Sequence, residues 1–186
     1  GLLCVLELTR AAMGAGAFIF ANVSACAVAD ALELTRQALV GTSAPDGLLL
    51  LPPFYHKPFS AAQGEEGVEA FYRAYLDGLS KMPAYVALEK PAGVYLYTFA
   101  LHTQQPISPA CYGRLVSAYP SLVKGIKASF VGIEEACAYA AAAPGTAVSV
   151  GNGKIQLECL KRGLHVVSGD CLPICWALVK LEKLHA

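Results

Sequence analysis

The stretch PSLVKGIKASF, residues 120–130, combines a short apolar run with a lysine near its end, Lys127. A continuous apolar run of this length is typical of a strand covered on both faces, as strands of parallel sheets are. A buried ammonium is costly, so such a lysine is expected to be paired or to have a chemical role as a neutral amine. The stretch therefore bears on both the fold and the function.

Five further strand-like runs flank this one, and helix-like segments separate them. Such repeated βα units predict right-handed crossovers and a parallel sheet. The flanking runs lie at residues 17–23, 47–53, 93–99, 146–151 and 164–169. Helices are expected at residues 3–13, 27–40, 66–79, 109–118, 133–142 and 154–162, with a last one from Pro173 onward.

Two architectures accommodate repeated βα units, an open doubly wound sheet and a closed (β/α)8 barrel. The first is usually marked by a glycine-rich phosphate loop, and the chain contains no GxGxxG or P-loop motif. The sequence therefore favours an α/β fold, a TIM barrel, with residues 1–186 as a single partial domain. A complete barrel takes about 250 residues and eight strands. Six runs predict that the first two βα units are absent from this chain, which would leave two long sheet edges.

The composition is that of a globular protein, with 55% hydrophobic and 15% charged residues. Fourteen basic and fourteen acidic residues cancel without clustering, which argues against nucleic acid or an anionic membrane as a partner. The longest apolar stretch, residues 14–29, is interrupted by Asn22 and Ser24 and is shorter than the roughly 20 residues of a spanning helix. No secretory signal pattern opens the chain. We expect a cytoplasmic protein, with an organellar matrix as the alternative.

The seven cysteines are odd in number and scattered along the chain. This fits reduced thiols better than a disulfide framework. Cys171 and Cys175 stand four residues apart, but no other Cys or His pair completes a tetrahedral set. We therefore expect no metal site.

The active site of a barrel lies at the carboxyl ends of its strands. Strict alternation places the odd-numbered residues of 123–129 on one face and Lys124 on the other. Lys127 is then expected to point inward, where poor hydration favours the neutral amine that attacks a ketone to form a Schiff base. A lysine that extends to water is the alternative. Tyr97, at the end of a neighbouring run, favours the inward-pointing, imine-forming lysine, because a phenol there can shuttle protons.

Four segments, in this order, resemble the family of dihydrodipicolinate synthase and N-acetylneuraminate lyase. The most specific is PPFYHKP, similar to the family's PPYYxKP, followed by the tyrosine and the lysine in the family's order with SP between them. The segments are GLLLLPPFYHKP (47–58), YTFALHTQQPISP (97–109), LVKGIKAS (122–129) and VSVGNG (148–153).

The resemblance implies a pyruvate-dependent class I aldolase or lyase on a (β/α)8 barrel. Lys127 would be the Schiff-base lysine, Tyr97 the acid/base tyrosine, and Tyr55 a second tyrosine that reaches a neighbouring subunit's site. It implies small 2-oxo acid and aldehyde substrates and a homo-oligomer, a dimer or a tetramer. No metal or diffusible cofactor would be needed beyond the covalent imine on Lys127. The candidate substrate-binding residues are His102, Gly151, Asn152 and Val167.

The chain also departs from the family pattern. The family's GTTGE loop is not in this sequence, and Ala128 stands where an aspartate is common. His102 stands where the family has an arginine, so the bidentate guanidinium fork for a carboxylate is lost. The alternative is that His102 is simply a solvent-exposed histidine of a loop. Asn152 and Gly153 replace two acidic residues. These departures keep a second hypothesis open, a catalytically inactive family member that binds a metabolite or a protein, whereas Lys127 and the tyrosines favour an enzyme.

Overall fold

The computed structural model describes residues 2–41, 43–54 and 59–167. Within these ranges no helix has the length and apolar character needed to cross a membrane. The helix expected from Pro173 onward and the candidate residue Tyr55 lie outside the described residues.

Six parallel strands form one sheet, and their order in the sheet is their order in the chain. Each of the six strand-like runs contains one of these strands, so the predicted alternation of strand and helix is confirmed. The sheet follows the strand order of a barrel wall. The strands are β1 (Phe20–Asn22), β2 (Gly47–Leu50), β3 (Gly93–Thr98), β4 (Val123–Ser129), β5 (Ala147–Gly151) and β6 (His165–Val166).

Helices connect the strands, and most occupy the predicted segments. A capping residue in the sequence explains where one of these helices begins. The hydroxyl of Ser108 accepts a hydrogen bond from the backbone N–H of Cys111 at 3.1 Å, which caps a helix with Pro109 at its first position. Two four-residue helices were not predicted. The helices are α1 (Leu2–Met13), α2 (Val28–Leu39), α3 (Phe59–Ser80), α4 (Pro83–Val86), α5 (Ala100–Thr103), α6 (Pro109–Ala118), α7 (Ile133–Ala142), the 3-10 turn η1 (Gly153–Ile155) and α8 (Gln156–Lys161).

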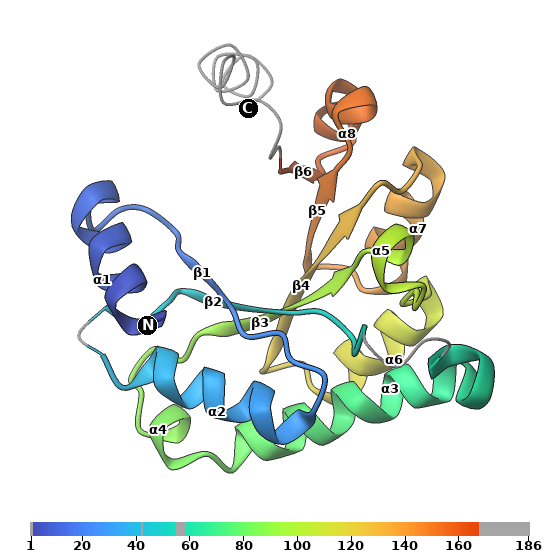
Figure 1. Cartoon of the computed structure of the whole chain (residues 1–186). Coiled ribbons are helices and arrows are strands. Elements are labelled where there is room, and N and C mark those ends of the chain that lie inside the picture. The colour runs from blue at the N-terminus through green and yellow to red at the C-terminus, as the bar shows by residue number, and fades with distance from the viewer. Residues whose placement is uncertain (1, 42, 55–58, 168–186) are drawn as a thin grey trace.

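The core lies between the helices and one face of the sheet. Figure 1 shows α2, α3, α4 and α6 together on one side of the strands. Alternate strand residues such as Leu48, Leu96 and Ile126 are fully buried there, while their neighbours Tyr95 and Lys127 on the other face are only half-buried. The strands were expected to be covered on both faces, but in the described chain burial alternates along β5 and along the first four residues of β3. The less covered face is the one that carries the candidate site.

The edges of this sheet are shorter than the sequence suggests. In the described part of the chain, β1 and β6 are the outermost strands, with three and two residues respectively. Short edge strands offer few unpaired backbone groups to another chain. The long exposed edges expected for six strands are therefore not what the structure shows.

A β-bulge changes the alternation at the start of β4. Val94 pairs with Val123, but the next residue, Tyr95, pairs with Gly125, so Lys124 is an extra residue in β4. Val123 consequently joins the buried row with Val94, and the stem of Lys124 lies beside Gly93. The predicted grouping of Val123 with Gly125 is wrong for this reason.

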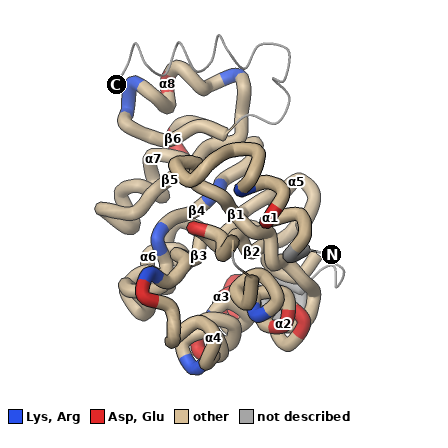
Figure 2. Tube along the Cα trace, turned by 90° about the vertical axis from the view of Figure 1, so that its left-hand side faces the viewer, with Lys and Arg blue, Asp and Glu red and all other residues tan. Residues whose placement is uncertain are grey.

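Charged residues of both signs are interspersed along the helices and their ends (Figure 2). The largest group of ion pairs joins α3 and α6. Arg114 contacts Glu69 at 2.7 Å and Glu65 at 3.1 Å, and Arg73 contacts Glu69 at 2.6 Å. These pairs connect two of the helices that cover the core.

Candidate active site

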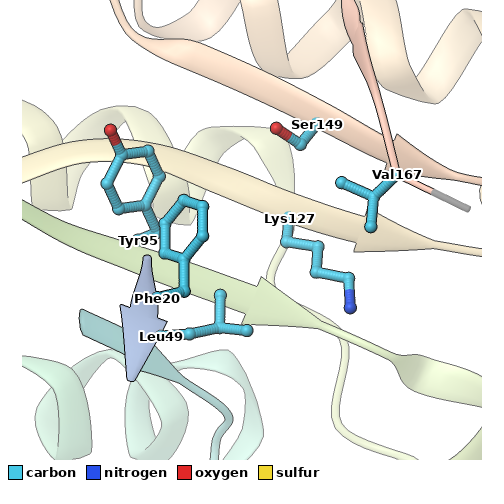
Figure 3. Close-up of a pocket in the computed structure, with 6 residues that line it drawn as sticks. All are labelled: Phe20, Leu49, Tyr95, Lys127, Ser149 and Val167. Atoms are coloured by element: carbon cyan, nitrogen blue, oxygen red, sulfur yellow. The ribbon is translucent and has the colours of Figure 1, made fainter. Parts of the chain in front are cut away.

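Lys127 lies in the middle of the sheet, towards the end of β4. Its register partners are Tyr97 on β3 and Ser149 on β5. The side chain is half-buried, and Figure 3 shows it extending along the strands towards their carboxyl ends. Its amine nitrogen Nζ lies 4.2 Å from the centroid of the Tyr97 ring, within the range of a cation–π contact. The structure thus brings together the two residues that the sequence singled out for imine chemistry.

The hydroxyl of Tyr97 has a partner that sequence reasoning did not assign. It lies 3.1 Å from Oγ of Ser129, and either oxygen can donate the hydrogen bond. Both side chains are largely buried, each 8% exposed. Ser129 is on the same face of β4 as Lys127, two residues further on, so alternation alone could have pointed to it.

Gly151 supports this hydrogen bond from β5. A Cβ atom at position 151 would lie 2.9 Å from the hydroxyl oxygen of Ser129, too close for an undisturbed contact. The absence of a side chain therefore leaves room for Ser129. Gly151 was predicted as a substrate-binding residue, and in the structure it borders the Tyr97 and Ser129 pair.

A cavity of about 220 Å³ lies beside Lys127 (Figure 3). Most of its lining is apolar, and its polar groups come from Lys127, Tyr95 and Ser149. Burial raises the pKa of Tyr95 above its ordinary value. A small apolar cavity with a few polar groups is the usual form of a ligand site. The lining residues are Phe20, Leu49, Tyr95, Lys127, Ser149 and Val167.

Of the predicted substrate-binding residues, Val167 lines this cavity, and His102 and Asn152 do not. His102 lies on α5, exposed to solvent, with its ring centroid 4.3 Å from that of Phe99. The side-chain amide of Asn152 donates to the carbonyl of Val131 at 2.9 Å and accepts from the N–H of Lys154 at 3.1 Å. Asn152 therefore stabilises the turn after β5.

Sequence reasoning missed four lining residues, Phe20, Leu49, Tyr95 and Ser149. Ser149 pairs with Lys127 across the sheet, so a correct register would have identified it. Phe20 packs edge-on against Tyr95, with ring centroids 4.7 Å apart, and no local signal predicts that contact. In the part of the chain that the structure describes, no three His, Cys, Asp or Glu side chains are arranged to hold a metal ion.

Comparison with known proteins identifies relatives of the chain. No protein-family model matches the chain. It is 29% identical over 159 residues to a 4-hydroxy-tetrahydrodipicolinate synthase from Synechococcus sp. (strain CC9605), which covers 86% of this chain and 47% of that protein. The chain therefore spans about half the length of this relative and of a second synthase of the same name.

Solved structures share the fold. The dihydrodipicolinate synthase from Agrobacterium tumefaciens str. C58 superposes with a TM-score of 0.76 at 21% identity, covering 97% of this chain and 57% of that one. The enzyme of the same name from Bacteroides thetaiotaomicron gives 0.76 at 20% identity, over 98% and 56% of the two chains. These are TIM barrels, so the predicted fold class is confirmed. The resemblance to the dihydrodipicolinate synthase family agrees with the names of the curated relatives.

Proposed function

We propose, from its relationship to the dihydrodipicolinate synthase family, that this chain carries the site of a Schiff-base-forming lyase or aldolase. The substrates would be pyruvate, or a related 2-oxo acid, and an aldehyde. Lys127 would form the covalent imine, with no metal or diffusible cofactor. The dimer or tetramer implied by the resemblance, with Tyr55 near a subunit interface, belongs to the same proposal.

The observation that carries this proposal is the contact between Lys127 and Tyr97. An amine and a phenol ring lie 4.2 Å apart on adjacent central strands, beside an apolar cavity. The amine extends towards the carboxyl ends of the strands, where barrel enzymes have their active sites.

In the proposed reaction, neutral Nζ of Lys127 attacks the ketone carbon of the 2-oxo acid. The carbinolamine loses water to give a protonated imine, which is an electron sink. Loss of a proton from the adjacent carbon gives an enamine. That carbon attacks the aldehyde carbonyl, whose oxygen takes up a proton, and hydrolysis of the new imine releases the product and the amine. Cleavage runs through the same steps in reverse.

Tyr97 would carry protons in these steps. Its hydroxyl can pass a proton to the oxygen of the carbinolamine, and the hydroxyl of Ser129 at 3.1 Å can receive or return one. The pair is mostly shielded from bulk water, so its geometry is set by the protein.

A second candidate function is a catalytically inactive barrel that binds a metabolite or a protein. The position of His102 and the engagement of Asn152 with the backbone favour it, because neither side chain lines the cavity. The retained Lys127 and Tyr97 favour the enzyme.

Reductive trapping separates the two candidates. We expect incubation with pyruvate and borohydride, followed by peptide mass mapping, to find a reduced adduct on Lys127. Lys127→Ala should abolish the labelling. Lys124→Ala is the matched control, because Lys124 is exposed and its Nζ donates to the carbonyl of Pro120. An unlabelled wild-type protein would support the inactive barrel instead.

A further inference from the structure

The cavity beside Lys127 is larger and more apolar than pyruvate requires. Its volume is about 220 Å³. By comparison, an apolar cavity of about 150 Å³ is large enough to hold a benzene molecule. The described residues that line the cavity are Lys127 and five uncharged side chains. Pyruvate has a single methyl group beside its keto and carboxylate groups, so it would leave most of this apolar wall uncovered.

The rings of Phe20 and Tyr95 form one end of the cavity. They pack edge to face with centroids 4.7 Å apart, and Figure 3 shows them side by side while the amine of Lys127 points away from them. Each ring lies over a glycine of the neighbouring strand. A Cβ at Gly47 would lie 2.6 Å from the Phe20 ring, and a Cβ at Gly125 would lie 2.7 Å from the Tyr95 ring. The absence of these two side chains therefore gives the rings their places on the sheet.

Leu49 and Val167 border the cavity from opposite sides of Lys127 (Figure 3). Leu49 is on β2 and Val167 directly follows β6, so they come from two strands to either side of β4. Part of the apolar lining is in contact with water, since Phe20 is 44% and Val167 39% exposed. An apolar group that covers this surface gains free energy from its removal from water.

The hydroxyl groups proposed for proton transfer lie outside this cavity, because neither Tyr97 nor Ser129 lines it. A carboxylate loses its hydration in apolar surroundings, so the carboxylate of a bound 2-oxo acid is expected near these hydroxyl groups. The carbon chain of the acid would then extend the other way, over the stem of Lys127 and between Leu49 and Val167. The two ends of such an acid thus match the polar and the apolar side of the site.

We propose that this cavity is the subsite for the side chain of the 2-oxo acid, and that this acid carries an extended or branched apolar group in place of the methyl group of pyruvate. The inference rests on the proposed function, because the acid is the one that forms the imine. The bond between Nζ of Lys127 and the ketone carbon forms as one water leaves, and borohydride then adds hydride to that carbon to give a secondary amine. The substituent takes no part in these bond changes, so the cavity acts on binding.

The first experiment compares three 2-oxo acids in the borohydride trapping of Lys127. 4-Methyl-2-oxopentanoate has three more carbons than pyruvate, and 2-oxoglutarate is of similar length but ends in a carboxylate. We expect half-maximal labelling at a concentration about tenfold lower for 4-methyl-2-oxopentanoate than for pyruvate, because each buried carbon adds to the affinity. 2-Oxoglutarate should need more than 4-methyl-2-oxopentanoate, because its second carboxylate would lose hydration. Half-maximal labelling by pyruvate at an equal or lower concentration than by 4-methyl-2-oxopentanoate would overturn the proposal.

Leu49→Phe tests the cavity itself, because the larger side chain narrows it. We expect the advantage of 4-methyl-2-oxopentanoate over pyruvate to shrink about threefold to tenfold. Leu8→Phe is the matched control, the same substitution at a leucine of α1 that is 66% exposed, and it should leave the advantage unaltered. Val167→Phe repeats the test at a more exposed lining position if Leu49→Phe does not fold. An undiminished advantage in a folded variant of either lining position would contradict the inference.

Fluorobenzene keeps this inference separate from the proposed function, because it has no carbonyl group and cannot form an imine. We expect its fluorine NMR signal to broaden with the wild-type protein and to sharpen again with Leu49→Phe. If this holds while no 2-oxo acid is trapped, the aldolase is refuted and the apolar subsite stands. If pyruvate is trapped and 4-methyl-2-oxopentanoate has no advantage, the substrate class inferred here is refuted alone.

Discussion

The hydroxyl of Ser129 sets the environment of the Tyr97 phenol. These two residues are 32 positions apart in the chain, yet their oxygens are 3.1 Å apart, in a space that Gly151 leaves open. A tyrosine that relays protons needs a fixed direction for its hydroxyl, and a single buried partner provides one. Ser129 is therefore a positioning residue for the proposed reaction.

Two substitutions test this arrangement. We expect Tyr97→Phe to slow the trapping of pyruvate on Lys127 by about 100-fold, because the proton carrier is removed. Ser129→Ala should slow it less, by up to about tenfold, and should change the pH dependence of the rate because the phenol loses its partner. Ser80→Ala, at an exposed serine on α3, is the control. Equal rates in Ser129→Ala and wild type at every pH would contradict the role of Ser129.

The pairing of β3 with β4 decides which side chains reach the cavity. The bulge at Lys124 sets the register from Gly125 onward, so Tyr97 lies opposite Lys127. Gly125 is part of this pairing, because a Cβ there would lie 2.7 Å from the Tyr95 ring and 2.4 Å from the carbonyl oxygen of Ala147. The ring of Tyr95 thus occupies the space above Gly125.

Gly125→Ala should therefore destabilise the protein. We expect a loss of about 1–3 kcal/mol in the free energy of unfolding, because both the ring and the backbone oxygen must move. Urea denaturation measures this directly. Gly153→Ala is the control, since a Cβ at that position meets no atom within 4 Å. Similar unfolding midpoints for the two variants would show that the sheet accommodates a side chain at Gly125.

Ion pairs among the helices link the stability of the whole molecule to pH. Burial alone would raise the pKa of Glu69, but hydrogen bonds from Arg114 and Arg73 outweigh it and lower the pKa overall. In Glu65, the hydrogen bond from Ser108 is the largest effect, and the pKa is again lowered. Both carboxylates therefore favour the folded state when they are ionised.

We expect the contribution of Glu65 and Glu69 to stability to be fully present above the ordinary glutamate pKa of 4.5 and to be lost as the pH drops below it. The sign follows because the unfolded chain binds protons at a higher pH than the folded one. Arg114→Met should flatten this decrease, and unfolding midpoints across the acid range would show it. The same acid dependence in Arg114→Met and wild type would mean that other carboxylates control it.

What the sequence determined by itself is local. The apolar runs predicted all six strands, the helix expected at residues 109–118 is α6, and alternation placed Ser129 on the face of Lys127. These features depend on residues a few positions apart, whose spacing sets which face they share. The family resemblance could also be recognised from the sequence, because it depends on short motifs and on their order along the chain.

Only the tertiary structure decided the contacts between strands. The bulge at Lys124 and the hydrogen bond between Tyr97 and Ser129 each depend on where a neighbouring strand lies. Periodicity within one segment carries no information about that register. A shift of one residue turns a side chain to the opposite face of the sheet, so the lining of the cavity was settled by pairing in three dimensions.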